Sequence, residues 1–298
     1  MTVALATSSP STFRVSALVA LSALVWGCWW IPLREIDGYG LKGDWTSVAV
    51  LGIAALCLTP LILGRLGRLL RAGAMVWGAG LFFGAMFSTY QHRLITADVV
   101  RVTLLFYLAP VWGTLLGMVF LGTRFSLQRM VVIVLGFAGA AVVLDFDGGI
   151  PSPRGLGEWM GLASGIAFAI GATFAHKVVG DYELEKVWLS LAFGALLSTV
   201  FALANPAFPT PSADQVFAAA PFAFGVVVVI LIPITWIMVW GAQRLDPGRI
   251  ALLLMLEVVA ASVTSALLAG EPYGIEKLIG TTMILTAGGV EALTQRKA

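Results

Sequence analysis

The chain has 298 residues, of which 59% are hydrophobic and 11% are charged, and its mean hydropathy is +0.94. Soluble proteins carry about 25% charged residues, so this composition excludes a soluble globular protein and indicates an all-α integral membrane protein. The net charge of +2 gives no reason to expect a nucleic-acid partner. Cys28 and Cys57 both lie in apolar runs, which argues against a disulfide framework or a cysteine metal site.

A helix needs about 20 apolar residues to cross the hydrocarbon of a bilayer. The sequence contains ten runs of about this length, at residues 15–33, 46–64, 74–93, 99–121, 127–146, 157–178, 185–204, 216–241, 248–269 and 276–294. No small-residue cleavage site follows the first run, which we therefore expect to be a permanent helix. The connections are short, so residues 1–298 are predicted to form a single membrane domain.

The Lys and Arg residues predict the orientation. They gather in the connections on one side, above all as Arg65, Arg68 and Arg71 between the second and third spans. Connections rich in Lys and Arg stay in the cytoplasm, and an even number of spans places both termini on one side. We expect a multi-pass protein of a bacterial-type inner membrane, with cytoplasmic N- and C-termini.

The chain contains an internal repeat. The segment "RVTLLFYLAPVWGTLLGMVFLG" from Arg101 aligns without a gap with "RIALLLMLEVVAASVTSALLAG" from Arg249, and this places Gly122 opposite Gly270. The alignment indicates two halves, 1–150 and 151–298, of five spans each. Because five is odd, the second half begins on the opposite side and the repeats are inverted. Inverted repeats with interrupted helices are a recurring plan of transporters, with the site near the midplane.

These two segments resemble the paired signatures of the EamA type of the drug/metabolite transporter superfamily. That pattern has a Leu-x-Pro or Leu-Glu-x break and then Gly-Glu at the helix end, here Gly270-Glu271. The resemblance covers essentially the whole chain, and it implies secondary transport by ten helices in two inverted five-helix repeats around a central cavity. Thr123 replaces the usual glutamate of the first repeat, and Val258 replaces a proline of the second, which weakens any claim for a carboxylate pair. "LFYLAP" is similar to the fourth-helix motif of the aromatic amino-acid exporter group.

Pro110 stands near the middle of the fourth span, where a proline costs about 3 kcal/mol or more. Broken backbone at membrane depth is expected where it is buried or lines a cavity. We therefore expect Pro110 to be a hinge that bends this helix and frees carbonyl groups toward a cavity. Thr103 and Tyr107 share its helix face, and Tyr107 suits an amphipathic ligand or a core position equally well.

Glu257 occupies the matching part of the ninth span. An acid at the centre of a membrane helix costs about 2.5–3.5 kcal/mol, so it is expected to face a cavity or a partner. Three roles remain open: proton coupling, contact with a substrate amine, or a neutral structural hydrogen bond. Desolvation favours the neutral carboxyl in each of them.

Aromatic side chains supply further cavity candidates. Trp26 lies deepest in the first span, whereas Trp29 and Trp30 lie near its outer end and are expected to join the aromatic belt at the membrane surface. The other aromatic candidates belong to the third and eighth spans: Phe83, Phe87, Tyr90 and Trp236. His92 is a second candidate for proton coupling, although an interfacial histidine without a role fits as well.

No metal-ligand spacing, serine nucleophile elbow or phosphate loop occurs. We therefore expect no catalytic residue, no metal and no cofactor. The expected function is export of small amphipathic metabolites, above all aromatic or apolar amino acids, by alternating access. The expected partners are the small-molecule substrate and the lipid bilayer, and the expected state is a monomer or a homodimer. The alternatives are a carrier for a drug, a nucleotide sugar or a lipid-linked sugar, and, less favoured, an intramembrane enzyme or a channel.

Overall fold

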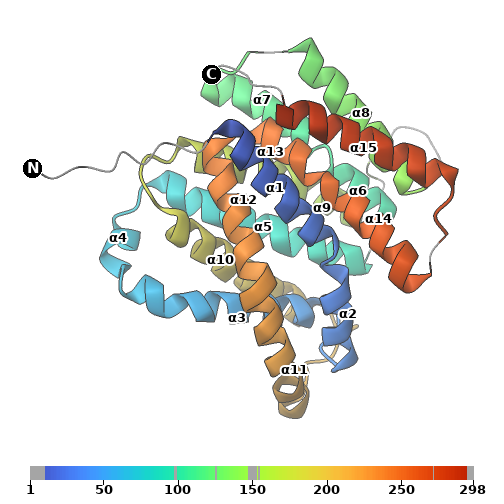
Figure 1. Cartoon of the computed structure of the whole chain (residues 1–298). Helices are drawn as coiled ribbons and strands as arrows, with labels where there is room; N and C mark the ends of the chain where they lie inside the picture. Colours follow the sequence, from blue (N-terminus) through green and yellow to red (C-terminus); the bar gives the residue numbers. More distant parts are fainter. Residues whose placement is uncertain are drawn as a thin grey trace, which may run out of the picture.

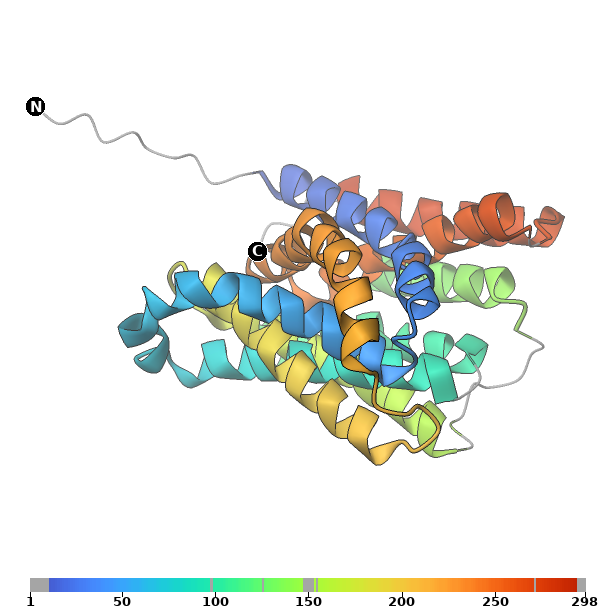
Figure 2. The same ribbon diagram turned by 90° about the horizontal axis from the view of Figure 1, so that it is seen from below.

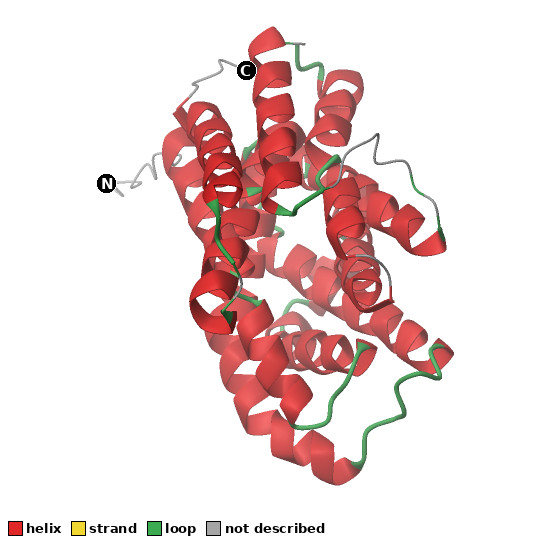
Figure 3. Cartoon of the chain, turned by 90° about the vertical axis from the view of Figure 1, so that its right-hand side faces the viewer, coloured by secondary structure: helices red, strands yellow, loops and turns green. Residues whose placement is uncertain are grey.

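The computed structural model describes residues 11–96, 99–124, 126–146, 153, 155–270 and 272–293. Over these residues every regular element is helical, and no strand occurs (Figure 3). Glu271 and both chain termini, on which the sequence makes predictions, lie outside the described residues. The helices before the midpoint of the chain are α1 (Thr12–Gly27), α2 (Trp30–Gly38), α3 (Asp44–Leu63), α4 (Leu66–Leu70), α5 (Ala74–Thr96), α6 (Val99–Phe106), α7 (Ala109–Leu121) and α8 (Leu127–Val143).

The helices after the midpoint begin with two long helices of 22 residues each. They are α9 (Leu156–Lys177), α10 (Glu183–Ala204), α11 (Ala213–Val226), the π-helical segment η1 (Val227–Leu231), α12 (Ile232–Arg244), α13 (Pro247–Leu254), α14 (Leu256–Ala269) and α15 (Ile275–Leu293).

Seven helical stretches are long and apolar enough to cross a membrane. They are Thr12–Gly38, Asp44–Leu63, Arg101–Leu121, Leu156–Lys177, Glu183–Ala204, Ala213–Arg244 and Pro247–Ala269. The remaining three predicted spans coincide with α5, α8 and α15, which are helical but do not meet the same criterion among the described residues. The all-helical membrane architecture is thus confirmed with seven candidate spans, and ten spans remain a prediction.

The helices pack in two groups. On one side α3, α10 and α5 lie in a row that continues to α9, and on the other side α8 and α15 lie side by side (Figure 1). The paired helices α6–α7 and α13–α14 run between these groups, and α1 covers α14, α12 and α13. Figure 2 shows the same separation from below, with α3 and α10 at one side and α15 at the other.

Glycine determines how closely several helices approach. Gly139 of α8 and Gly280 of α15 face one another, and a Cβ on either one would lie within 2.8 Å of the carbonyl oxygen of the other. Small residues allow helix backbones to approach in this way in a membrane. This contact makes the fifth and tenth predicted spans a closely packed pair.

Four of the predicted spans are interrupted. The helix through residues 101–121 breaks at Tyr107 and Leu108, and α7 starts at Ala109 with Pro110 in its first turn. The chain at 247–269 breaks at Met255, where tighter i→i−3 hydrogen bonds replace the α-helical pattern. The first predicted span breaks between Gly27 and Trp30, and the eighth contains η1.

The carbonyl that Pro110 leaves without its helical donor is that of Phe106. This carbonyl lies against α9, where a Cβ on Gly165 would come within 2.7 Å of the oxygen. The expectation that the freed carbonyl turns toward a cavity is therefore corrected: it turns toward a glycine of the neighbouring helix, which leaves room for it.

Candidate functional site

A chamber of about 570 Å3 lies beside the two interrupted helices. Small-molecule sites commonly enclose about 300–1,000 Å3, so the chamber can hold a metabolite. Tryptophan side chains from α1, α2 and the turn between them form one wall, and α6 and α14 contribute polar groups to the other. The polar lining residues here are Thr103 of α6, Tyr107 at the break after it, and Glu257, Ser262 and Ser265 of α14.

Tyr107 and Glu257 form the inner end of the chamber, which we call its floor, and a hydrogen bond joins their side chains. The Tyr107 hydroxyl donates to Oε1 of Glu257 at 2.6 Å, and both residues are buried. Tyr107 lies at the break between α6 and α7, while Glu257 lies in the first turn of α14, directly after the break at Met255. A helix N-terminus favours a negative charge, so the break itself helps to hold a carboxylate at this depth.

A smaller void of about 30 Å3 extends from the floor into the protein. It shares Trp26, Tyr90, Gln91 and Glu257 with the chamber. Aromatic rings enclose it: the Trp26 and Phe87 ring centroids are 5.5 Å apart, and those of Tyr90 and Phe106 are 4.6 Å apart. The combined space is apolar along its walls and polar at the floor.

Most of the residues predicted from the sequence come together here. Trp26, Thr103, Tyr107, Tyr90 and Glu257 line the chamber, and Phe87 lines the void. Tyr90 and Thr103 face each other with their hydroxyl oxygens 3.5 Å apart.

Two predicted aromatic residues lie elsewhere. Phe83 is fully buried against Phe168 and Gly171 and lines neither cavity. Trp236 faces a different pocket, beside Arg65 and Arg68, while its neighbour Thr235 lines the void instead. The π-helical turn of η1 ends four residues before Thr235, and it changes which face of α12 points inward.

Trp29 and Trp30 also differ from their prediction. Trp29 is only 4% exposed and stacks on Trp26, with ring centroids 5.9 Å apart. The indole N–H of Trp30 donates to Thr264 Oγ1 of α14 at 3.1 Å. Because α1 ends at Gly27 and the chain turns before α2, both rings fold onto the chamber instead of joining an aromatic belt.

His92 lies behind the chamber wall in a buried polar cluster. Its Nδ1 is 2.7 Å from both carboxylate oxygens of Asp44, and its ring stacks on Phe201. The adjacent Gln91 lines the chamber and accepts a hydrogen bond from the Ser47 hydroxyl. His92 is therefore a buried, paired histidine and not an interfacial one, and the sequence gives no sign of its partner 48 residues away.

Charged side chains lie together at one end of the chamber, which we call its mouth. The mouth carries Arg34, Asp145 and Lys277, and Lys277 Nζ is 3.6 Å from Asp145 Oδ2. Asp145 follows α8 and Lys277 lies in the first turn of α15. The opposite ends of α8 and α15 carry a buried ionic network around Arg129. We call this end of the molecule the closed end.

The ionic network centres on Arg129, which is 3% exposed. Its guanidinium lies 2.8 Å from Oδ1 of Asp246 and 3.0 Å from Oε1 of Glu291. Asp246 also caps α13 by accepting from the backbone N–H of Arg249 at 3.1 Å. The side chain of Arg249 donates to Ser16 Oγ at 3.1 Å, so the network joins α1, α8, α13 and α15.

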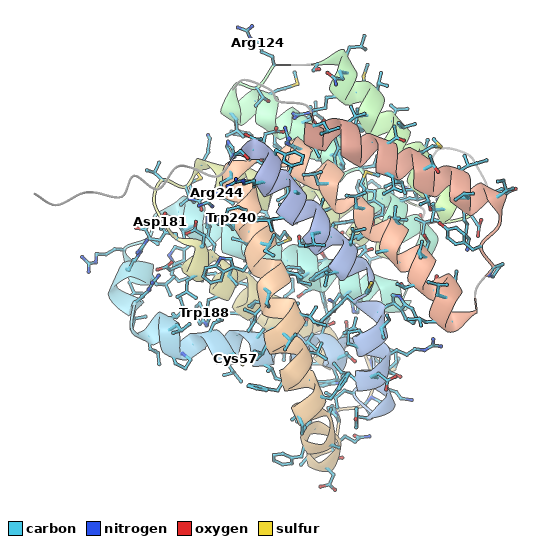
Figure 4. All side chains as sticks on the ribbon, viewed as in Figure 1. Cys57, Arg124, Asp181, Trp188, Trp240 and Arg244 are labelled. Atoms are coloured by element: carbon cyan, nitrogen blue, oxygen red, sulfur yellow. The ribbon has the colours of Figure 1, made fainter. Side chains whose placement is uncertain are left out.

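Close helix packing reinforces this closed end. A Cβ on Gly113 of α7 would lie within 2.6 Å of the Pro247 carbonyl at the start of α13. Nearby, Arg244 at the end of α12 stacks on Trp240 and pairs with Glu183 of α10, whereas Arg124 extends from the edge of the molecule (Figure 4). In contrast, α6 and α14 have no comparable contact, and the chamber lies between them.

Comparison with known proteins gives one curated relative and a structural likeness. No protein-family model matches the chain. The chain is 22% identical over 286 residues to the "Uncharacterized transporter YvbV" of Bacillus subtilis (strain 168), and the match covers 92% of this chain and 90% of the relative. A solved crystal structure matches with a TM-score of 0.68 and 18% identity, over 94% of this chain and 98% of the other, which shows a shared fold. Similarity to a transporter over almost the whole length, combined with seven apolar helices, supports a multi-pass membrane transporter.

Proposed function

We propose that the protein is a secondary transporter of the EamA type of the drug/metabolite transporter superfamily. It moves small amphipathic metabolites, first among them aromatic and apolar amino acids, outward across the inner membrane by alternating access. The observation that carries this proposal is the chamber whose floor is the Tyr107–Glu257 hydrogen bond between two interrupted helices.

Details of the backbone support the proposed inverted repeat. The breaks at Tyr107 and Met255 fall on aligned positions of the two repeats. Gly122 ends α7 with φ 67° and ψ 19°, and Gly270 ends α14 with φ 73° and ψ 19°. Their backbone N–H groups donate to Gly117 and Ser265, which are aligned positions as well. Two helices that break and end alike at the same spacing are the expected result of a repeat.

The contrast between the two ends supports alternating access. The halves α7 and α13 are in close contact at the closed end, while α6 and α14 stand apart around the chamber. In the proposed cycle the breaks at Tyr107–Leu108 and Met255 are the hinges. The halves α6 and α14 close as α7 and α13 separate, so that the floor is exposed to one side at a time.

A matched pair of cysteine variants tests which end is open. Ser262 lines the chamber, and its aligned counterpart Thr114 packs against Gly248 at the closed end. In a background where Cys28 and Cys57 are replaced with alanine, we expect Ser262→Cys to react with a hydrophilic maleimide and Thr114→Cys to be protected. Equal labelling of the two cysteines in the absence of ligand would contradict a one-sided resting state.

Glu257 and His92 are the proposed proton-coupling groups. Glu257 forms the floor, and the pair of His92 with Asp44 lies directly behind Gln91 of the wall. Protonation of either group would change the charge next to the chamber. Proton binding would thereby be coupled to the interaction between Tyr107 and Glu257 and to substrate binding beside it.

Flux measurements in liposomes test the function. We expect purified wild-type protein to carry labelled aromatic or apolar amino acids, with a rate that depends on a pH gradient, and Glu257→Gln to lose most of this flux. A glutamine side chain has nearly the size of glutamate and keeps an oxygen that accepts from Tyr107, but it cannot carry the charge. A loss of flux in this variant would therefore be due to the missing charge. Absence of flux for every amino acid would refute the proposed substrate, and gradient-independent flux that persists in Glu257→Gln would refute coupling through this residue.

A further inference from the structure

The void beneath the chamber floor has the size of a single small polar group. About 10–15 Å3 is enough for one water molecule, and the void measures about 30 Å3. It therefore has room for a water molecule or a primary ammonium group, but not for an aromatic ring. It continues directly from the chamber, because Glu257 and Trp26 line both.

One polar group of this void has no hydrogen-bond partner. The Ser22 hydroxyl donates to the Val19 carbonyl at 2.8 Å, and the Gln91 oxygen accepts from Ser47. The Thr235 hydroxyl has no partner among the described residues, although Thr235 is only 1% exposed. Leaving a buried hydroxyl unpaired is unfavourable, so this group indicates a ligand.

A π-helical segment lies shortly before Thr235 in the same apolar stretch. In a regular helix of this protein, the buried Thr173 donates to the carbonyl of Ala169, four residues earlier, at 2.8 Å. For Thr235 the corresponding residue is Leu231, the last residue of η1, where the backbone follows i→i−5 bonding and Ile232 donates to Val227. Such π-helical insertions are frequent at functional sites, and this one leaves the Thr235 hydroxyl available to the void.

The charge of the void favours a cation. Among the described residues that line the void, Glu257 is the only carboxylic acid, and none is a Lys, Arg or His. The rings of Trp26, Phe87 and Phe106 surround it, and aromatic faces attract cations. The basic side chains Arg34 and Lys277 stand only at the mouth of the larger chamber.

We propose that this void is a subsite for a primary ammonium group, which is held by the Glu257 carboxylate and the Thr235 hydroxyl. The proposal rests on the proposed transport function and names the group by which a substrate is recognised. The apolar body of the ligand lies in the chamber against the tryptophan wall. Because no cation among the described lining residues of the void pairs with a carboxylate, an arylalkylamine binds more tightly than the matching α-amino acid, and an aryl carboxylate binds more weakly than either. A trimethylated ammonium group is too large for the void.

Binding measurements with matched ligands test the subsite. We would measure quenching of tryptophan fluorescence in detergent-solubilised full-length protein with phenethylamine, its N,N,N-trimethyl derivative, phenylalanine and 3-phenylpropionate. We expect affinity to fall in the order phenethylamine, phenylalanine, 3-phenylpropionate, with the trimethyl derivative far weaker than the primary amine. Equal affinity for the primary and the trimethylated amine would overturn the proposal.

Variants of Thr235 identify the group that binds. Loss of a hydrogen bond to a charged group weakens binding about tenfold or more. We therefore expect Thr235→Val to lower the affinity for phenethylamine by that factor. Thr235→Ser keeps the hydroxyl and should retain the affinity. Thr173→Val changes a buried threonine that lines neither cavity and serves as the matched control. Unchanged amine affinity in a folded Thr235→Val protein would refute the role of this hydroxyl.

The subsite and the transport function fail in different ways. Binding is measured without a membrane or gradient, so it reports the subsite alone. If the wild-type protein carries amino acids in liposomes but phenethylamine neither binds nor competes, the subsite is wrong and the transport function stands. If phenethylamine binds with the expected dependence on Thr235 and no solute is carried, the transport function is wrong and the subsite stands.

Discussion

Replacing Arg129 with methionine is expected to lower the free energy of unfolding by about 3–5 kcal/mol, the usual cost of removing one partner from a buried ion pair. Arg129 lies 2.8 Å from Asp246 and 3.0 Å from Glu291, and Glu291 is almost fully buried. The variant leaves these carboxylates without the guanidinium that compensates them. Reversible unfolding in mixed micelles, followed by circular dichroism, measures the loss.

A control at an exposed arginine nearby in the sequence separates the effect of burial from the effect of charge. Arg124→Met removes an exposed arginine that extends from the edge of the molecule (Figure 4), and it should change the free energy by no more than about 0.5 kcal/mol. Adding Glu291→Leu to Arg129→Met should recover part of the stability, because it removes one of the uncompensated charges. Similar losses for Arg124→Met and Arg129→Met would show that the buried network does not stabilise the fold.

A larger side chain at Gly27 is expected to destabilise the protein by about 1–3 kcal/mol and to abolish transport. A Cβ on Gly27 would meet the backbone carbonyl of Glu257, and it would lie within 2.8 Å of the Ala260 Cβ and 2.9 Å of the Ala261 nitrogen. Two of these three atoms belong to the backbone of α14, so Gly27→Val must push α1 away from the helix that carries the floor of the chamber. Unfolding in mixed micelles and flux in liposomes measure the two effects.

Gly52 provides the matched control for this prediction. It lies inside α3, where nothing approaches within 4 Å of a Cβ. Gly52→Ala should therefore stabilise the helix by roughly 0.5–1 kcal/mol and leave transport unchanged. A Gly27→Val protein that is as stable and active as the wild type would mean that α1 and α14 do not need this close contact.

The positions of the helices and the centre of the site follow from local sequence. Runs of apolar residues place the helices, and the break near Pro110 follows from the missing N–H of proline. Tyr107 and Glu257 were predicted from aligned faces of two repeats, and their side chains do meet. Such features depend on the spacing of residues within one helix or on the alignment of two repeated segments. Both can be read directly from the sequence.

Features that depend on tertiary contacts are not visible in the sequence. The choice of Thr235 over Trp236 depends on a single π-helical turn of five apolar residues, and the nearby Pro233 does not by itself indicate that the irregularity is π-helical. The pairing of His92 with Asp44 depends on how two helices are placed side by side. Arg129 has the sequence context of an interfacial charge, and only the packed structure shows that it is buried.

The closed end also determines where the membrane potential acts. Water can enter the chamber as far as its floor, whereas the layer around Arg129 and Gly113 excludes it. Once the protein is embedded, the electric field is therefore concentrated across this thin layer instead of the full thickness of the bilayer. Moving one net charge through it is worth about 2.3 kcal/mol per 100 mV. A cationic ligand that passes Glu257 with no compensating charge would carry current, and its transport rate would depend on voltage.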